Sequence, residues 1–150
     1  MSQMNIFTRT LFPATVALAT VVICLTASAD EGKHSSVDVS KLPPAATKSG
    51  VTYATDIKPI FETSCVKCHG AEKPKAGLRL TSLEGALKGG KEGKVIEPGN
   101  SAKSILVISV ARISADDEEW MPPNNNKAKI GPLSKDQVGL IRAWIDQGTK

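Results

Sequence analysis

Five consecutive residues, Cys65-Val66-Lys67-Cys68-His69, bring two thiols and an imidazole together within one short stretch of this 150-residue chain. A C-x-x-C-H motif is typical of covalent haem attachment. Two cysteines three residues apart on one helical turn can each form a thioether with a haem vinyl group. The histidine that follows then offers a neutral ring nitrogen to the iron. The motif therefore predicts one covalently bound haem c, held by Cys65 and Cys68, with His69 as an axial ligand.

Three other uses of two neighbouring cysteines remain as alternatives. A dithiol oxidoreductase also has a C-x-x-C motif, but it normally follows a β-strand in a βαβ unit. A zinc site needs about four ligands, and outside the motif the chain offers only Cys24 and His34. A structural disulfide between Cys65 and Cys68 would leave His69 unexplained.

The first 29 residues have the pattern of an export signal. Arg9 is the only charged residue among them, residues 10–29 are uncharged, and the stretch ends in Ala27-Ser28-Ala29. Small residues at these positions are typical of a signal-peptidase site. We therefore expect residues 1–29 to be a signal peptide, cleaved after Ala29, and the protein to be periplasmic or exported. The alternative is an uncleaved segment that anchors the chain in the membrane.

Composition divides the remaining chain into a linker and one folded domain. Residues 30–50 are polar and interrupted by glycine and proline, which predicts a flexible linker. Residues 51–150 have the length of a single small domain. The formal net charge of the whole chain is only +4, and charges of both signs are interspersed. This balance argues against nucleic-acid binding. With only 4% aromatic residues, the domain has a modest core, which a large bound group would help to stabilise.

Apolar spacing in residues 51–150 predicts about four short helices. The first begins near Asp56 as N-cap and places Ile57, Phe61, Cys65 and Cys68 on one stripe. A second is opened by a capping box at residues 81–84 and ends at residues 89–90. A third spans residues 102–112 and is capped by Asn100 or Ser101; the β-branched run at residues 105–108 leaves a strand as the alternative, but the cap and the length favour a helix. The last has a capping box formed by Ser134 and Gln137, with Gly148 just beyond its end. No segment alternates strictly between apolar and polar residues, so the fold is expected to be mostly α.

A long loop, residues 113–132, contains the candidate for the sixth iron ligand. Of three methionines, only Met121 would remain after signal removal, and Pro122 and Pro123 stiffen the backbone that follows it. Ligation by methionine and histidine raises the reduction potential of haem iron. We therefore predict His69 and Met121 as the two iron ligands, with His34 as the alternative to Met121.

Other residues of the chain have less specific roles in this hypothesis. Phe61, Trp120 and Trp144 are expected to line the haem or the contact between the first and last helices. The acidic run at residues 116–119 could be a docking patch for a basic redox partner or a solvated loop.

On these motifs the chain resembles a class I c-type cytochrome and, more closely, the planctomycete-type cytochrome c domains. The resemblance spans about residues 53–148 and includes the following segments: Asp56 to Phe61, Cys65 to Gly70, Lys75 to Leu80, Pro98 to Ser101, Met121 to Pro123 and Leu140 to Ile145. It implies that Cys65 and Cys68 bind haem, that His69 is the proximal ligand and that Met121 is the distal one. It also implies a small fold of about four short helices wrapped around one covalently bound haem.

The sequence hypothesis is thus a monohaem c-type cytochrome acting in periplasmic electron transfer with redox partner proteins. No acid–base pair or activated nucleophile is evident, so we expect an electron carrier rather than an enzyme. The alternative is a haem-binding subunit or domain of a larger redox enzyme or sensor, with an open or exchangeable sixth position.

Overall fold

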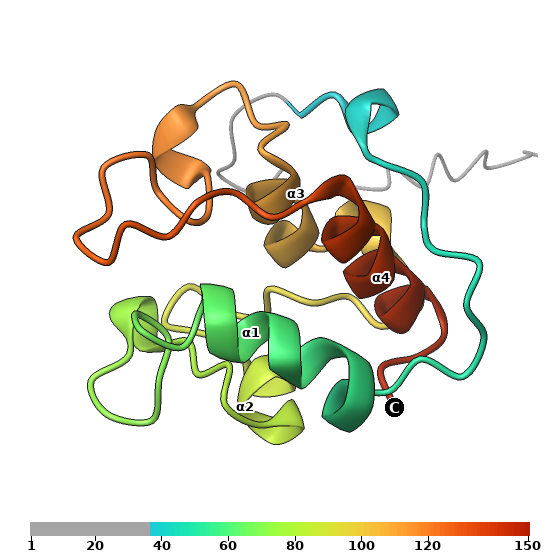
Figure 1. Cartoon of the computed structure of the whole chain (residues 1–150), viewed down its shortest axis with the longest axis horizontal. Helices are drawn as coiled ribbons and strands as arrows, with labels where there is room; N and C mark the ends of the chain where they lie inside the picture. The colour runs from blue at the N-terminus through green and yellow to red at the C-terminus, as the bar shows by residue number, and fades with distance from the viewer. Residues whose placement is uncertain (1–36) are drawn as a thin grey trace, which may run out of the picture. The chain divides into compact units, whose positions relative to one another are not determined.

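Helices supply the regular structure of residues 37–150, the part of the chain that the computed structural model describes. Its four α-helices are α1 (Lys58–Ser64), α2 (Leu83–Lys88), α3 (Ile105–Ala111) and α4 (Lys135–Asp146), as Figure 1 shows. Short 3-10 or π turns accompany them at Val39–Lys41, Tyr53–Ile57, Lys75–Gly77, Ser101–Lys103 and Asp117–Glu119. Within residues 37–150, β pairing is limited to two isolated bridges. The predicted mostly α fold is confirmed. The predicted signal peptide and His34 lie outside the described residues.

The start of the first helical segment differs from the prediction. A π turn over Tyr53–Ile57 precedes α1, and Thr52, not Asp56, is its N-cap. The Thr52 hydroxyl accepts the Thr55 N–H at 3.3 Å, and the Asp56 carboxylate accepts the Thr52 N–H at 3.0 Å. Hydrogen bonds from Lys48 and then from the Thr52 backbone lower the pKa of Asp56 to about 2. The carboxylate therefore closes a reciprocal cap instead of starting the helix.

The second helix begins one residue later than a capping box at residues 81–84 would place it. Ser82 is the N-cap of α2, and its hydroxyl accepts the N–H of Gly85 at 3.1 Å. The third residue of the helix is thus Gly85 rather than a glutamate, so the predicted box does not form. The predicted end is confirmed, because Gly89 has a φ of +83° there.

The third helix is shorter than predicted. Asn100 does act as a cap, accepting the N–H of Lys103 at 3.2 Å, but it caps the 3-10 turn Ser101–Lys103. The α-helix α3 begins only at Ile105 and ends at Ala111, and the C-cap residue Arg112 that follows has a left-handed backbone with a φ of 55°. Both predicted caps therefore belong to a turn that precedes the helix.

The last helix agrees with the prediction at both ends. Ser134 and Gln137 form the reciprocal capping box, with hydrogen bonds of 2.9 and 3.2 Å. Gly148, just past the end of α4, has a φ of +90°. In residues 37–150, α4 is the longest helix with 12 residues, and no helix there is long and apolar enough to cross a membrane.

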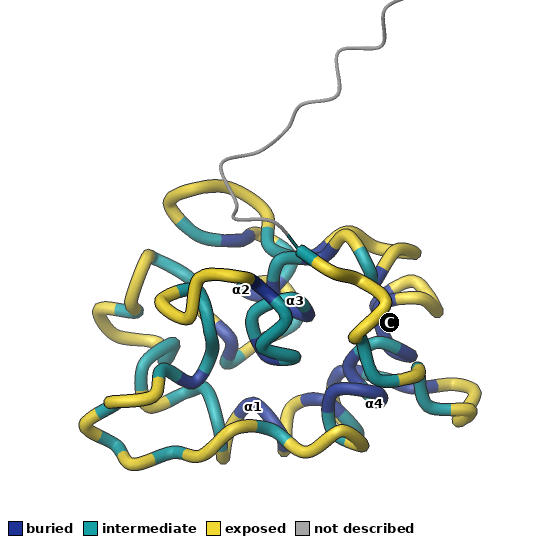
Figure 2. The backbone as a smooth tube through the Cα atoms, turned by 90° about the horizontal axis from the view of Figure 1, so that it is seen from above, coloured by how far each residue is buried: buried dark blue, intermediate teal, exposed yellow. Residues whose placement is uncertain are grey.

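An aromatic cluster joins the two ends of the domain. Tyr53, Phe61 and Trp144 are all buried, and their ring centroids lie 6.0 to 6.4 Å apart. The Tyr53 hydroxyl donates to the carbonyl of Leu80 at 3.0 Å, so its polar end is satisfied. Phe61 and Trp144 thus lie at the contact between the first helical segment and α4. In Figure 2 the buried residues are concentrated on α4, with smaller groups on α1 and α3, while the exposed ones follow the outer loops.

Part of the segment predicted to be a linker contacts α4. The Ala46 N–H donates to the Gly139 carbonyl at 2.9 Å, and the Gln147 side chain donates to the Lys48 carbonyl at 2.8 Å. Gly139 is buried within the helix, and a Cβ built on it would lie 2.7 Å from the backbone oxygen of Pro44. This approach requires a residue without a side chain.

We expect Gly139→Ala to lower the free energy of unfolding by about 1 kcal/mol. Alanine favours a helix interior over glycine by about 1 kcal/mol, but overpacking against backbone costs about 1–3 kcal/mol. Urea titration of the haem-loaded protein measures the difference. Gly131→Ala is the matched control, because its Cβ would meet nothing within 4 Å. If Gly139→Ala is as stable as the wild type or more stable, the segment beside α4 can move away from the added Cβ at little energetic cost.

Candidate haem site

The C-x-x-C-H motif lies on a tight turn that follows α1. Cys65 is the C-cap of α1 and donates its N–H to the Phe61 carbonyl at 2.8 Å. The Cys65 carbonyl then accepts the N–H groups of Cys68 at 3.0 Å and His69 at 2.9 Å. The prediction that both cysteines continue the helix is therefore wrong. The two hydrogen bonds to the Cys65 carbonyl instead stabilise a turn that keeps the side chains of Cys65, Cys68 and His69 close together.

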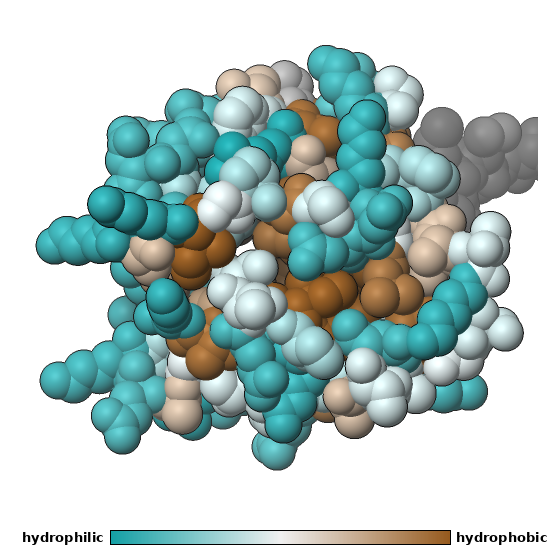
Figure 3. All heavy atoms as spheres, in the orientation of Figure 1, coloured by the Kyte–Doolittle hydropathy of each residue, from teal (hydrophilic) through white to brown (hydrophobic). Residues whose placement is uncertain are grey.

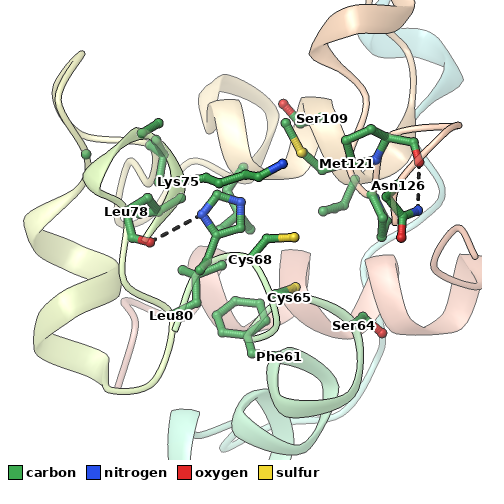
Figure 4. A pocket seen from close by; sticks show the side chains of 18 of the residues that line it. Phe61, Ser64, Cys65, Cys68, Lys75, Leu78, Leu80, Ser109, Met121 and Asn126 are labelled. Atoms are coloured by element: carbon green, nitrogen blue, oxygen red, sulfur yellow. Dashed lines mark hydrogen bonds between the residues drawn. The ribbon is translucent and has the colours of Figure 1, made fainter. Parts of the chain in front are cut away.

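The imidazole of His69 is oriented by a backbone carbonyl. Its Nδ1 lies 3.2 Å from the Leu78 oxygen, the contact drawn as a dashed line in Figure 4. A protonated Nδ1 donates this hydrogen bond and leaves Nε2 as the nitrogen that can bind a metal. Burial lowers the pKa of His69, which favours the neutral form that metals bind. Both effects prepare the ring to be an axial ligand.

Met121 reaches the same space from the loop that follows α3. Its N–H donates to the Ser109 carbonyl at 3.0 Å, so the last turn of α3 holds its backbone. The side chain is half-buried and packs against the core. Figure 4 shows the sulfur atoms of Met121, Cys65 and Cys68 around one space. The structure thus brings all four predicted site residues to one cavity.

The cavity that these residues share has a volume of about 740 Å³, within the usual range for cofactor sites. Its apolar walls come from separate segments and include Phe61, Leu78, Leu80, Val95, Leu106 and Val110. On the face of the molecule drawn in Figure 3, hydrophobic atoms gather near the centre and hydrophilic side chains border them. A large, mostly apolar group fits such walls.

Cys65 lacks the lowered thiol pKa that is typical of a redox-active dithiol. Both thiols are free, and burial, with a smaller effect from Cys68, raises the pKa of Cys65 to about 12. Redox-active C-x-x-C motifs instead have a thiol with a lowered pKa. The described residues also contain no strand that could precede the motif. Nor do residues 37–150 contain a group of three or more Cys, His, Asp or Glu side chains that could hold a metal ion.

The donors around the cavity therefore fit a haem better than they fit the alternatives. Two thiols can form thioethers, the Nε2 of one imidazole is not used by the contact to Leu78, and one methionine thioether lines the same walls. Imidazole and methionine sulfur are established axial ligands of haem iron in c-type cytochromes.

Comparison with known proteins supports this interpretation. Residues 65–125 match the family model described as Planctomycete cytochrome C. This match confirms the resemblance to a planctomycete-type cytochrome c domain. It begins at the first cysteine of the motif and extends past Met121, so all four predicted site residues lie within it. The family indicates a haem-binding role in electron transfer and a covalently bound haem c. No curated protein and no solved structure matches the chain.

Two features of the site were not evident from the sequence. Trp120, predicted to line the haem or a helix contact, is not among the residues that line the cavity. Its indole N–H donates to the Ser114 carbonyl at 3.1 Å, and its ring faces the guanidinium of Arg112. Five lysines also line the cavity, which the interspersed charges of the sequence did not indicate: Lys67, Lys75, Lys91, Lys94 and Lys127.

Proposed function

We propose that this chain is a monohaem c-type cytochrome that carries electrons in the periplasm, with its iron ligated by His69 and Met121. The observation that carries the proposal is the shared cavity. Cys65, Cys68 and His69 approach it from the turn after α1, and Met121 approaches it from the loop after α3. The haem, when bound, supplies a one-electron Fe(II)/Fe(III) couple.

The chain's own residues bind the haem, orient its ligands and keep water away. Cys65 and Cys68 attach the haem through thioethers, while the Leu78 carbonyl fixes the ring of His69. Buried Phe61 and Leu80 exclude water from the walls, and a dry pocket raises the reduction potential. Two ligands that stay bound in both oxidation states keep the structural change small, which favours rapid electron transfer.

We further propose that the protein is exported, that its signal is cleaved after Ala29 and that it exchanges electrons with redox partner proteins. The uncharged stretch of residues 10–29 and the small residues at positions 27–29 support export. The low net charge of +4 argues against a nucleic-acid partner.

Expression of the full chain in a host with haem maturation machinery tests the proposal. We expect a coloured protein whose intact mass corresponds to residues 30–150 plus one haem, and whose haem stays with the chain on a denaturing gel. The reduced protein should bind carbon monoxide only slowly, because Met121 occupies the sixth position. Expression in a host without that machinery is the control and should give a colourless product.

Each alternative predicts a different result in this experiment. Fast and complete carbon monoxide binding by the native protein would contradict ligation by Met121 and favour a haem enzyme or sensor. A colourless product from the competent host would contradict haem binding altogether. A mass that retains residues 1–29 would leave the haem site intact but contradict cleavage.

A further inference from the structure

We propose that Arg112 is a positioning residue for the sixth iron ligand, holding the loop on both sides of Met121 through the Trp120 ring and the Pro122 carbonyl. The inference rests on the proposed ligation by Met121. Arg112 is not among the residues that line the cavity, so it would act on the iron only through Met121.

One carbonyl joins the end of α3 to the loop that contains the ligand. The Ser109 oxygen accepts the N–H of Arg112 at 3.2 Å and the N–H of Met121 at 3.0 Å. Arg112 adopts a left-handed conformation, with a φ of 55°, at the position where the helix ends. The chain leaves α3 at Arg112 and returns to the same carbonyl at Met121.

The side chain of Arg112 contacts the residues before and after Met121. One guanidinium nitrogen donates to the Asn124 side chain at 3.0 Å, and the other terminal nitrogen donates to the Pro122 carbonyl. Its guanidinium carbon lies 5.5 Å from the ring centroid of Trp120, within range of a cation–π interaction. The planar guanidinium thus links three positions of the loop at once through a rigid fork of donors, which the compact ammonium group of lysine does not have.

This arrangement matters because methionine alone is a flexible ligand. Its side chain has three rotatable bonds, so its sulfur stays in place only if its backbone does. Without the guanidinium, the Met121 N–H still donates to Ser109 and the Trp120 indole still donates to Ser114. The loop should then loosen without unfolding. Loss of two hydrogen bonds should raise the fraction of molecules with Met121 detached by roughly tenfold or more.

Carbon monoxide binding to the reduced, haem-loaded protein tests the proposal, with the reduction potential as a second measurement. We expect Arg112→Ala to bind carbon monoxide roughly tenfold faster than the wild type and to have a lower potential. Arg112→Lys keeps the charge but has one donor group in place of the fork, so its rate should lie between the two. Haem content should be equal in all three proteins.

Arg142→Ala is the matched control. Arg142 also donates to a side chain and to a backbone carbonyl, at Ser101 and Pro43, but it lies on α4 and has no hydrogen bond to residues 120–124. Loss of the Arg142 side chain should lower the melting temperature, while the rate of carbon monoxide binding should stay at the wild-type value. An equal acceleration in Arg142→Ala would show general loosening and overturn the proposal.

The outcomes separate this inference from the proposed function. If Met121→Ala opens the iron and Arg112→Ala behaves as wild type, Met121 is the ligand and Arg112 does not position it. If the wild type already reacts as fast as Met121→Ala, ligation by Met121 is wrong, and the role of Arg112 is refuted with it. If Arg112→Ala does not accumulate, Arg112→Gln is measured instead and judged by the same rates.

Discussion

Replacement of both Cys65 and Cys68 by alanine should give a colourless chain that folds poorly. Without the two thioethers the haem is no longer tied to the polypeptide, and the cavity of about 740 Å³ loses the group that fills it. Many of its walls are apolar side chains that already pack against the core. A group that binds only the folded state stabilises it, so its loss should lower both the melting temperature and the helical circular dichroism. Haem staining on a denaturing gel should be abolished.

Lys67→Ala is the matched control for this double substitution. Lys67 lies between the two cysteines and also lines the cavity, but it offers no thiol. Its replacement should leave haem staining and the melting temperature close to the wild type. A double cysteine variant that melts at the temperature of the haem-loaded wild type would show that haem is not part of the core.

Local signals account for the parts of the fold that the sequence predicted well. The two partners of the α4 capping box, Ser134 and Gln137, lie within four residues of each other. The box is therefore recognisable in the sequence, and it forms in the structure. At α2, two successive residues with hydroxyls, Thr81 and Ser82, can each cap a helix. The sequence does not decide between them, and the structure has Ser82.

The start of α1 was missed for a different reason. In an α-helical capping box, the reciprocal partner lies three residues after the cap. Here a π turn comes first, and the partner of Thr52 is Asp56, four residues later. Rare π turns are not signalled by apolar periodicity.

The candidate site also has a part that the sequence predicts and a part that it does not. Cys65, Cys68 and His69 were predicted because their chemistry depends on spacing within five residues, and Met121 because the cleaved chain would have no other methionine. The partners that orient them are mostly backbone carbonyls, at Leu78 for the imidazole and at Ser109 for the Met121 backbone. A carbonyl is present in every residue, so no side-chain pattern reveals which one will be used. Only the three-dimensional path of the chain brings it into place.

Replacement of Met121 by alanine should open the sixth position of the iron while leaving the haem attached. The methionine thioether stabilises Fe(II), so its loss should lower the reduction potential, by roughly 0.1 V or more within the range of about 0.8 V that axial ligands span. Reduced protein should then bind carbon monoxide rapidly and completely, as its absorbance spectrum would show. Haem staining should be unchanged, because Cys65 and Cys68 still form both thioethers.

Ser109→Ala is the matched control for Met121→Ala, because Ser109 lines the same cavity and shares the contact that holds the ligand. Its contribution to that contact is its backbone carbonyl, which accepts the Met121 N–H and which alanine retains. The potential and the slow carbon monoxide reaction should therefore stay at their wild-type values in Ser109→Ala and change only in Met121→Ala. An unchanged potential in Met121→Ala would remove Met121 from the coordination of the iron. The haem would then need its sixth ligand from another residue, or would have an open position suited to binding gases or peroxides.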